Sequence, residues 1–111
     1  MSLTSELFGD VLVAHTPDEL NEDTSGPFHA ELIDAADRGR KKFVLQMDRT
    51  EAYDSAGLTA LLDLQDEVRE AGAILKISGL DEPGNTIFKL TRLDRRFDIF
   101  DSVIDAVQSF R

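Results

Sequence analysis

The residues best suited to chemistry lie in one short segment near the middle of the 111-residue chain. Residues 53–58 read YDSAGL, which places Ser55 directly after Asp54 and at the start of a strongly amphipathic helical pattern. Backbone N–H groups lack intrahelical partners at a helix N-terminus, and the helix dipole is positive there. A phosphate on Ser55 would therefore be accepted without disruption of the fold. The same residues also fit a plain N-cap, which Asp54 alone would supply.

Gly57, in the same segment, bears on binding. It falls in the first helical turn, where glycine costs about 1 kcal/mol relative to alanine. A residue without a Cβ atom at that position would let the backbone of a partner, or a nucleotide, approach closely.

Other candidates for catalysis are few. His15 and His29 fall in different predicted elements without metal-ligand spacing, which is typical of structural or exposed histidines. The sequence has no cysteine, and therefore no disulfide, thiolate metal site or cysteine nucleophile. It also lacks the G-x-S-x-G, G-x-x-x-x-G-K-[ST] and G-x-G-x-x-G motifs. We expect a non-catalytic protein that uses no cofactor and no metal.

The charge balance of the chain constrains its partners. A net charge of −10, from 22 acidic and 12 basic side chains, disfavours nucleic acid and anionic lipid. It favours a basic protein partner, or it serves only solubility. No apolar run approaches the roughly 20 residues of a membrane-spanning helix, and the N-terminus lacks a signal-peptide pattern. We expect a cytoplasmic protein, folded as a single domain over residues 1–111.

The elements that must position Ser55 follow from hydrophobic periodicity. Apolar residues on either side of Gly9-Asp10 predict antiparallel strands over 5–8 and 11–15, with a loop over 17–21. A hydroxyl cap at residues 24–25, followed by Pro27 in the first turn, predicts a helix that runs to Arg38.

The rest of the chain continues the alternation of strands and helices. Apolar runs and cap residues predict a buried strand over 43–47, a loop over 48–53, a helix over 55–71, a strand over 73–78, a short helix capped by Asn85-Thr86, an edge strand over 97–100 and a terminal helix capped by Ser102. The inward stripe of helix 55–71 is Leu58, Leu61, Leu62 and Val68 with Leu64 at its margin, and that of the terminal helix is Val103, Ile104, Val107 and Phe110. The order β-β-α-β-α-β-α-β-α predicts a small α/β domain with a mixed sheet.

Residues 54–58 (DSAGL) resemble the D-S-[SA]-G-L element of STAS domains, especially that of the anti-sigma-factor antagonists. Four further segments match this family in order. Residues 9–13 (GDVLV) look like its opening hairpin, and residues 19–21 (ELN) resemble its E-L-D segment. Residues 70–75 (EAGAIL) match its R-x-x-G-G-x-L passage, and residues 90–94 (LTRLD) with Phe97 look like its L-x-x-T-G-L-D segment. The chain departs from the family pattern at Asn21, Ala56, Thr59 and Arg92. The resemblance implies a STAS-like (SpoIIAA-like) α/β fold, with about four helices around a mixed sheet.

The resemblance also implies a switch. In that family a partner anti-sigma factor, which is also a serine kinase, phosphorylates the serine that matches Ser55. The modified antagonist is released, and a serine phosphatase resets it. Phosphorylation adds about −1.5 to −2 charge at a surface that faces a nucleotide-holding partner, so repulsion opposes rebinding. Besides Ser55, the residues expected to contact the partner are Asn21, Asp23, Asp54, Ala56, Gly57, Leu58 and Thr59.

Two other functions stay open from the sequence. Stand-alone STAS domains also serve as unphosphorylated subunits of transport or scaffold assemblies, and the altered residues Asn21 and Thr59 favour that role. A small enzyme or nucleotide-binding protein is the third alternative, because residues 21–23 (NED) and Asp54 would meet where ligands often bind to α/β sheets. The sequence leaves the oligomeric state undetermined.

Overall fold

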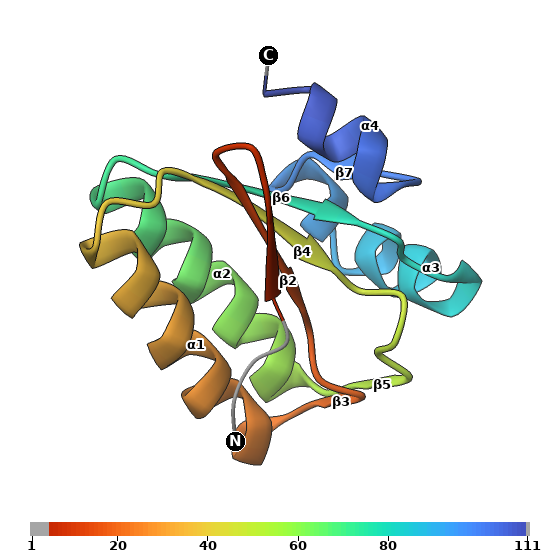
Figure 1. Cartoon of the computed structure of the whole chain (residues 1–111). Helices are drawn as coiled ribbons and strands as arrows, with labels where there is room; N and C mark the ends of the chain where they lie inside the picture. The colour runs from red at the N-terminus through yellow and green to blue at the C-terminus, as the bar shows by residue number, and fades with distance from the viewer. Residues whose placement is uncertain (1–4, 111) are drawn as a thin grey trace.

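The computed structural model describes residues 5–110, which form a mixed five-stranded sheet in the order β1-β2-β4-β6-β7 (Figure 1). β1 pairs antiparallel with β2, and the pairs β2–β4, β4–β6 and β6–β7 are parallel. The strands are β1 (Ser5–Phe8), β2 (Val11–His15), β4 (Lys42–Gln46), β6 (Ile74–Ser78) and β7 (Ile99–Phe100). The predicted α/β fold class, with its opening hairpin and mixed sheet, is confirmed.

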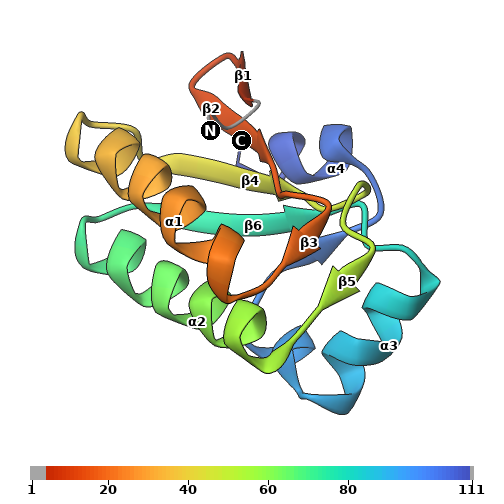
Figure 2. The ribbon, with the colours of Figure 1, turned by 90° about the horizontal axis from the view of Figure 1, so that it is seen from below.

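The helices cover opposite faces of this sheet. α1 (Glu22–Asp37) and α2 (Ser55–Glu70) lie side by side on one face, and α4 (Val103–Gln108) lies on the other (Figures 1 and 2). α3 (Glu82–Leu90) and the 3-10 turn η1 (Leu93–Arg95) follow β6 and connect it to β7. Because α1 and α2 pack against each other and on the sheet, the start of α2 has a fixed position.

Strand alternation explains how one sheet supports two apolar layers. Successive side chains on a strand point to opposite faces. Phe43 and Leu45 of β4 therefore enter the main core under α1 and α2, whereas Val44 packs in the smaller cluster with Ala106 of α4. All three of these β4 side chains are fully buried, as the sequence predicted for a central strand.

A second, two-stranded sheet lies beside the start of α2 (Figure 2). β3 (Glu19–Leu20) pairs in parallel with β5 (Ala52–Tyr53), with Leu20 opposite Tyr53. The sequence predicted loops for both segments, and that prediction is wrong for these residues. Because β3 leads into α1 and β5 leads into α2, their pairing places the first turns of the two helices close together.

The predicted start of α1 is also wrong. The helix begins after Asn21, whose side chain accepts hydrogen bonds from the backbone N–H groups of Asp23 (2.9 Å) and Thr24 (3.2 Å). Thr24 closes a capping box, because its Oγ1 accepts from the Asn21 N–H at 3.1 Å. Pro27 therefore lies inside the helix, not at its first position. The reciprocal cap at Asn21 outweighs the start signal given by Pro27.

Three further predictions about the helices need correction. α3 is capped by Asp81, whose Oδ1 accepts a hydrogen bond from the Gly84 N–H, and not by Asn85-Thr86. Ile104 was expected to face inward from α4, but its side chain is 68% exposed. Leu64 was placed at the margin of the α2 stripe, but it is buried in the core. The Ser102 cap of α4 is confirmed by a hydrogen bond from the Asp105 N–H at 3.1 Å.

Candidate functional site

Ser55 is the first residue of α2, and its side chain is exposed. The capping role belongs to Asp54, whose Oδ1 accepts a hydrogen bond from the Gly57 N–H at 2.8 Å. Because Asp54 supplies the cap, the Ser55 hydroxyl is not needed for capping. The α2 helix has 16 residues, so a full helix dipole presents its positive end beside this hydroxyl.

Gly57 has a different role from the one expected. The residue is buried, and a Cβ atom placed on it would lie only 2.1 Å from the carbonyl oxygen of Leu20. The same oxygen accepts a hydrogen bond from the Asp54 N–H at 3.2 Å. We expected the backbone of a partner to approach the position where Gly57 lacks a Cβ atom. That space is filled by Leu20 of β3 in the same chain. Gly57 fixes the start of α2 against β3 and so sets the position of Ser55.

The other residues expected at the partner surface divide into two groups. Asp23, Asp54, Ala56 and Thr59 are exposed on the first turns of α1 and α2, near Ser55. Asn21 and Leu58 are half-buried: Asn21 caps α1, and Leu58 packs against the main core. The Asn21 Oδ1 atom is already used by two backbone N–H groups, so its role in the fold is structural.

Tyr53, which the sequence did not identify as a functional residue, anchors the segment before Ser55. Its ring contacts the Phe88 ring edge-on with centroids 6.4 Å apart, which ties β5 to α3. The Tyr53 hydroxyl is buried and has no hydrogen-bond partner among the described residues. Burial, assisted by the nearby charge of Asp81, raises the pKa of Tyr53 from 10.0 to about 12.

The raised pKa of Tyr53 predicts a loss of stability at high pH. Below pH 10 this phenol is neutral in both the folded and unfolded states, so it has no effect on the pH dependence. Between about pH 10 and 12 only the unfolded state releases the proton, so the free energy of unfolding falls as pH rises through this window. Tyr53 is the only tyrosine in the chain, so tyrosinate absorbance reports on it alone. We expect a titration midpoint near pH 12 in the folded protein and near 10 in urea. A folded midpoint near that in urea would contradict the burial of the hydroxyl.

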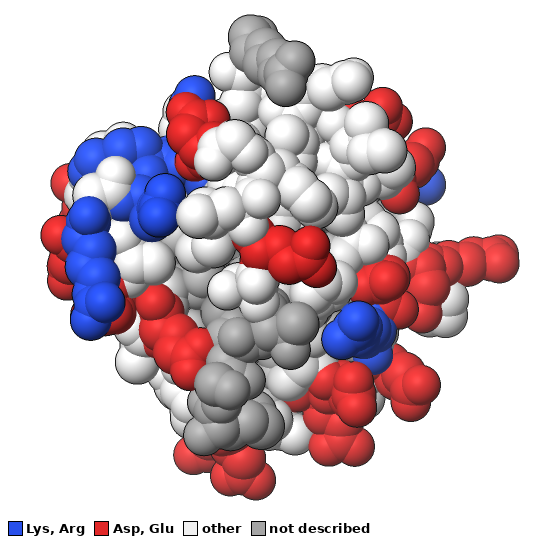
Figure 3. All heavy atoms as spheres, viewed as in Figure 1, with Lys and Arg blue, Asp and Glu red and all other residues white. Residues whose placement is uncertain are grey.

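The surface around Ser55 is acidic. Exposed carboxylates lie on the segments that surround the start of α2: Asp18, Glu19, Glu22, Asp23, Asp48, Glu51, Asp54, Asp81 and Glu82. Figure 3 shows acidic side chains mainly along the lower and right-hand edges and a basic group at the left edge, where Figure 1 places the turn from α1 to β4. Arg38, Arg40 and Lys41 belong to that turn and are exposed. Basic side chains thus gather at the end of the helical layer opposite to the start of α2.

Residues 5–110 contain neither a cluster of metal ligands nor a helix suited to span a membrane. No group of three or more His, Asp or Glu side chains in this range is arranged to hold a metal ion. None of the helices in the same range has the length and apolar character needed to cross a membrane.

The fold and the position of this serine define an α/β domain of the STAS type. The chain belongs to the STAS domain family, because the family model matches residues 3–106. The resemblance noted from residues 54–58 is therefore confirmed at the level of the family.

Particular relatives extend this result. A Thermotoga maritima protein named "Putative anti-sigma factor antagonist" is 23% identical over 107 residues, which cover 96% of this chain and 95% of the relative. The crystal structure of a T. maritima protein of the same description has a TM-score of 0.86 at 22% identity, covering 96% of this chain and 92% of that one.

Two other solved structures share the fold. The anti-sigma factor antagonist SpoIIAA, in its unphosphorylated form, has a TM-score of 0.81 at 15% identity, covering 99% of this chain and 96% of that one. A sulfate transporter family protein from Wolinella succinogenes has a TM-score of 0.79 at 19% identity, covering 90% of this chain and 84% of that one. At these identities the likeness concerns the fold.

Proposed function

We propose that this chain is an anti-sigma-factor antagonist, which binds an anti-sigma factor with serine-kinase activity and is released when Ser55 is phosphorylated. The observation that carries the proposal is the exposed Ser55 hydroxyl at the N-terminus of α2, with the capping role held by Asp54. The similarity to antagonists supports the choice of partner. The function proposed is protein binding, without catalysis, inside the cytoplasm.

The geometry supports a phosphoacceptor for two reasons. A phosphate on Ser55 would face backbone N–H groups of the first turn of α2, which lack acceptors within the helix. The Asp54 cap would be kept, because it uses the Gly57 N–H and not that of Ser55. Modification would therefore change the surface and leave the fold intact.

Phosphorylation would act through charge and hydration. The group adds about −1.5 to −2 charge beside Asp54, in a region that is already acidic. A partner that holds a nucleotide presents phosphate groups of the same sign across the contact. Binding would also require removal of water from the new dianion, which is costly unless basic groups pair with it. Both effects favour release, and a serine phosphatase would restore binding.

A STAS subunit of a transport or scaffold complex is the second candidate. The likeness to the Wolinella protein favours it, as do Asn21 and Thr59, which differ from the antagonist pattern.

Calorimetric titration of the purified chain with the anti-sigma factor kinase of the same organism separates the two candidate functions. Saturable binding supports the antagonist. No heat with the kinase, together with binding to the cytoplasmic face of a transporter, favours the second candidate.

A further inference from the structure

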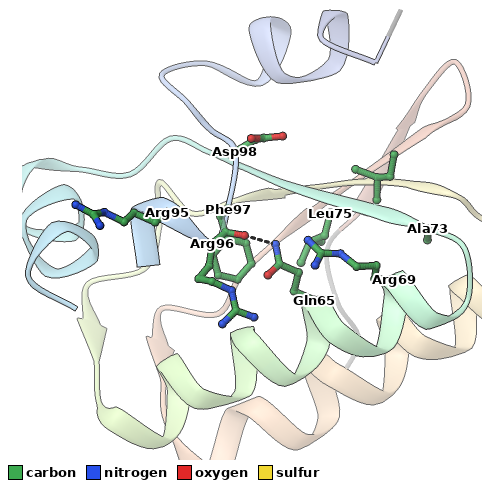
Figure 4. Close-up of a pocket in the computed structure, with 9 residues that line it drawn as sticks. Gln65, Arg69, Ala73, Leu75, Arg95, Arg96, Phe97 and Asp98 are labelled. Atoms are coloured by element: carbon green, nitrogen blue, oxygen red, sulfur yellow. Dashed lines mark hydrogen bonds between the residues drawn. The ribbon is translucent and has the colours of Figure 1, made fainter. Parts of the chain in front are cut away.

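A cavity with basic side chains lies where the C-terminal half of α2 faces the segment from η1 to β7 (Figure 4). Its volume is about 310 Å³, and its apolar lining includes Ala73, Leu75 and Phe97. Gln65 and Arg69 reach it from α2. At 1.5 Å per residue along the helix, they are about 15 and 21 Å from Ser55. The cavity is therefore separate from the phosphoacceptor site.

The arginines of this cavity are unusual in so acidic a chain. Arg69, Arg95 and Arg96 all line it, although the chain has only 12 basic residues against 22 acidic ones. Within residues 5–110, no carboxylate lies at ion-pair distance from Arg69, and the nearest for Arg96 is Asp66 at 3.5 Å. The carboxylate of Asp98, which also lines the cavity, points away from Gln65 and Arg69 (Figure 4). The Arg95 guanidinium points away as well, and that of Arg96 extends toward α2, so Arg96 and Arg69 are the cations that lie on either side of Gln65.

Gln65 supplies an observation that is independent of the arginines. Its side chain is only 4% exposed and extends between Arg96 and Arg69 (Figure 4). The amide Nε2 donates a hydrogen bond to the carbonyl oxygen of Arg96, which fixes the orientation of the amide. The Oε1 atom is left buried without a hydrogen-bond partner among the described residues. Such an acceptor is costly unless something donates to it.

We infer that this cavity binds a small oxyanion that carries at least one O–H group, such as hydrogenphosphate or a hydroxycarboxylate. The planar guanidinium groups of Arg69 and Arg96 offer paired N–H donors, which match the oxygens of such anions. The O–H group of the ligand donates a hydrogen bond to the Oε1 atom of Gln65, which then has a partner. The volume of the cavity exceeds that of a single phosphate, so larger hydroxylated acids also fit.

The test is a ¹⁵N-resolved NMR titration of the full chain at constant ionic strength, with two matched pairs of anions. Hydrogenphosphate and sulfate have the same shape, but only the first carries an O–H group near neutral pH. Malate and succinate differ by one hydroxyl. We expect saturable shifts at residues around the cavity, with the hydroxylated member of at least one pair binding at least tenfold more tightly. The pair whose two members bind with different affinity shows whether the ligand is a phosphate or a hydroxycarboxylate.

Variants assign the binding to this site. Arg69→Gln and Arg96→Gln are each expected to weaken binding at least tenfold, and both residues are exposed, so the fold is kept. Gln65→Met should abolish the preference for the hydroxylated anion. Arg49→Gln, which removes one positive charge from an exposed loop after β4, should change nothing. The proposal is overturned if shifts do not saturate, if each pair binds equally to the wild-type chain, or if the Arg69 and Arg96 variants bind as the wild type does.

Discussion

Phosphorylation of Ser55 is expected to lower the affinity for the anti-sigma factor at least 100-fold, which corresponds to about 2.7 kcal/mol. The reason is that the phosphate adds a dianion to the proposed contact surface, which is exposed and already includes the carboxylate of Asp54. Calorimetry with the homogeneous phosphoprotein gives the dissociation constant directly. Ser55→Ala should bind like the unmodified chain, because the Ser55 side chain is exposed and the cap of α2 is supplied by Asp54, so the substitution leaves the surface and the fold largely unchanged.

The control for this prediction separates local charge from net charge. Ser55→Glu adds one negative charge at the proposed contact and should weaken binding, although less than a phosphate does. Gln108→Glu adds the same charge to an exposed position of α4, on the opposite face of the sheet. Equal effects of the two substitutions would contradict a contact surface centred on Ser55.

Replacement of Gly57 by alanine is expected to lower the free energy of unfolding by about 2–3 kcal/mol. The added Cβ would lie 2.1 Å from the backbone oxygen of Leu20, so β3 or the start of α2 must move. Equilibrium unfolding in urea measures the loss. Because the shift displaces Ser55 from β3, Gly57→Ala should also weaken partner binding.

Gly84 provides a matched comparison for Gly57. Both glycines are the third residue of their helix, and each donates its N–H to the capping aspartate at 2.8 Å. A Cβ on Gly84 would lie 3.0 Å from the side-chain oxygens of Asp81 and Tyr53. These atoms are the ends of side chains and not backbone, so a small side-chain shift relieves the contact. Gly84→Ala should therefore cost no more than about 1 kcal/mol, since the helix propensity of alanine offsets the contact. Similar losses for the two variants would show that the Leu20 contact does not hold α2.

Much of the fold follows from local patterns in the sequence. The continuous apolar run of β4 and the long amphipathic stripe of α2 identify a buried strand and the helix that follows it. β3 and β5 were missed, because a two-residue strand is too short to show a period and its pairing depends on contacts distant in the chain. The start of α1 was misplaced because Pro27 is a strong local signal, whereas the capping box of Asn21 depends on reciprocal bonds.

The site was predictable to the extent that it is local. Asp54 and Ser55 follow from the helix-start pattern, and the structure places them there. The contact of Gly57 with Leu20 and the anchoring of Tyr53 on Phe88 join residues far apart in sequence, and no spacing rule brings them together. The same holds for the anion cavity, where Gln65 meets the backbone of Arg96.

The most direct test of the switch is the position of phosphate after incubation with the cognate anti-sigma factor kinase and ATP. Peptide mass spectrometry should find a single phosphate on Ser55 and none on the neighbouring Thr59, and Ser55→Ala should remain unmodified. Phosphate on another residue, or none on a chain that binds the kinase, would contradict the account.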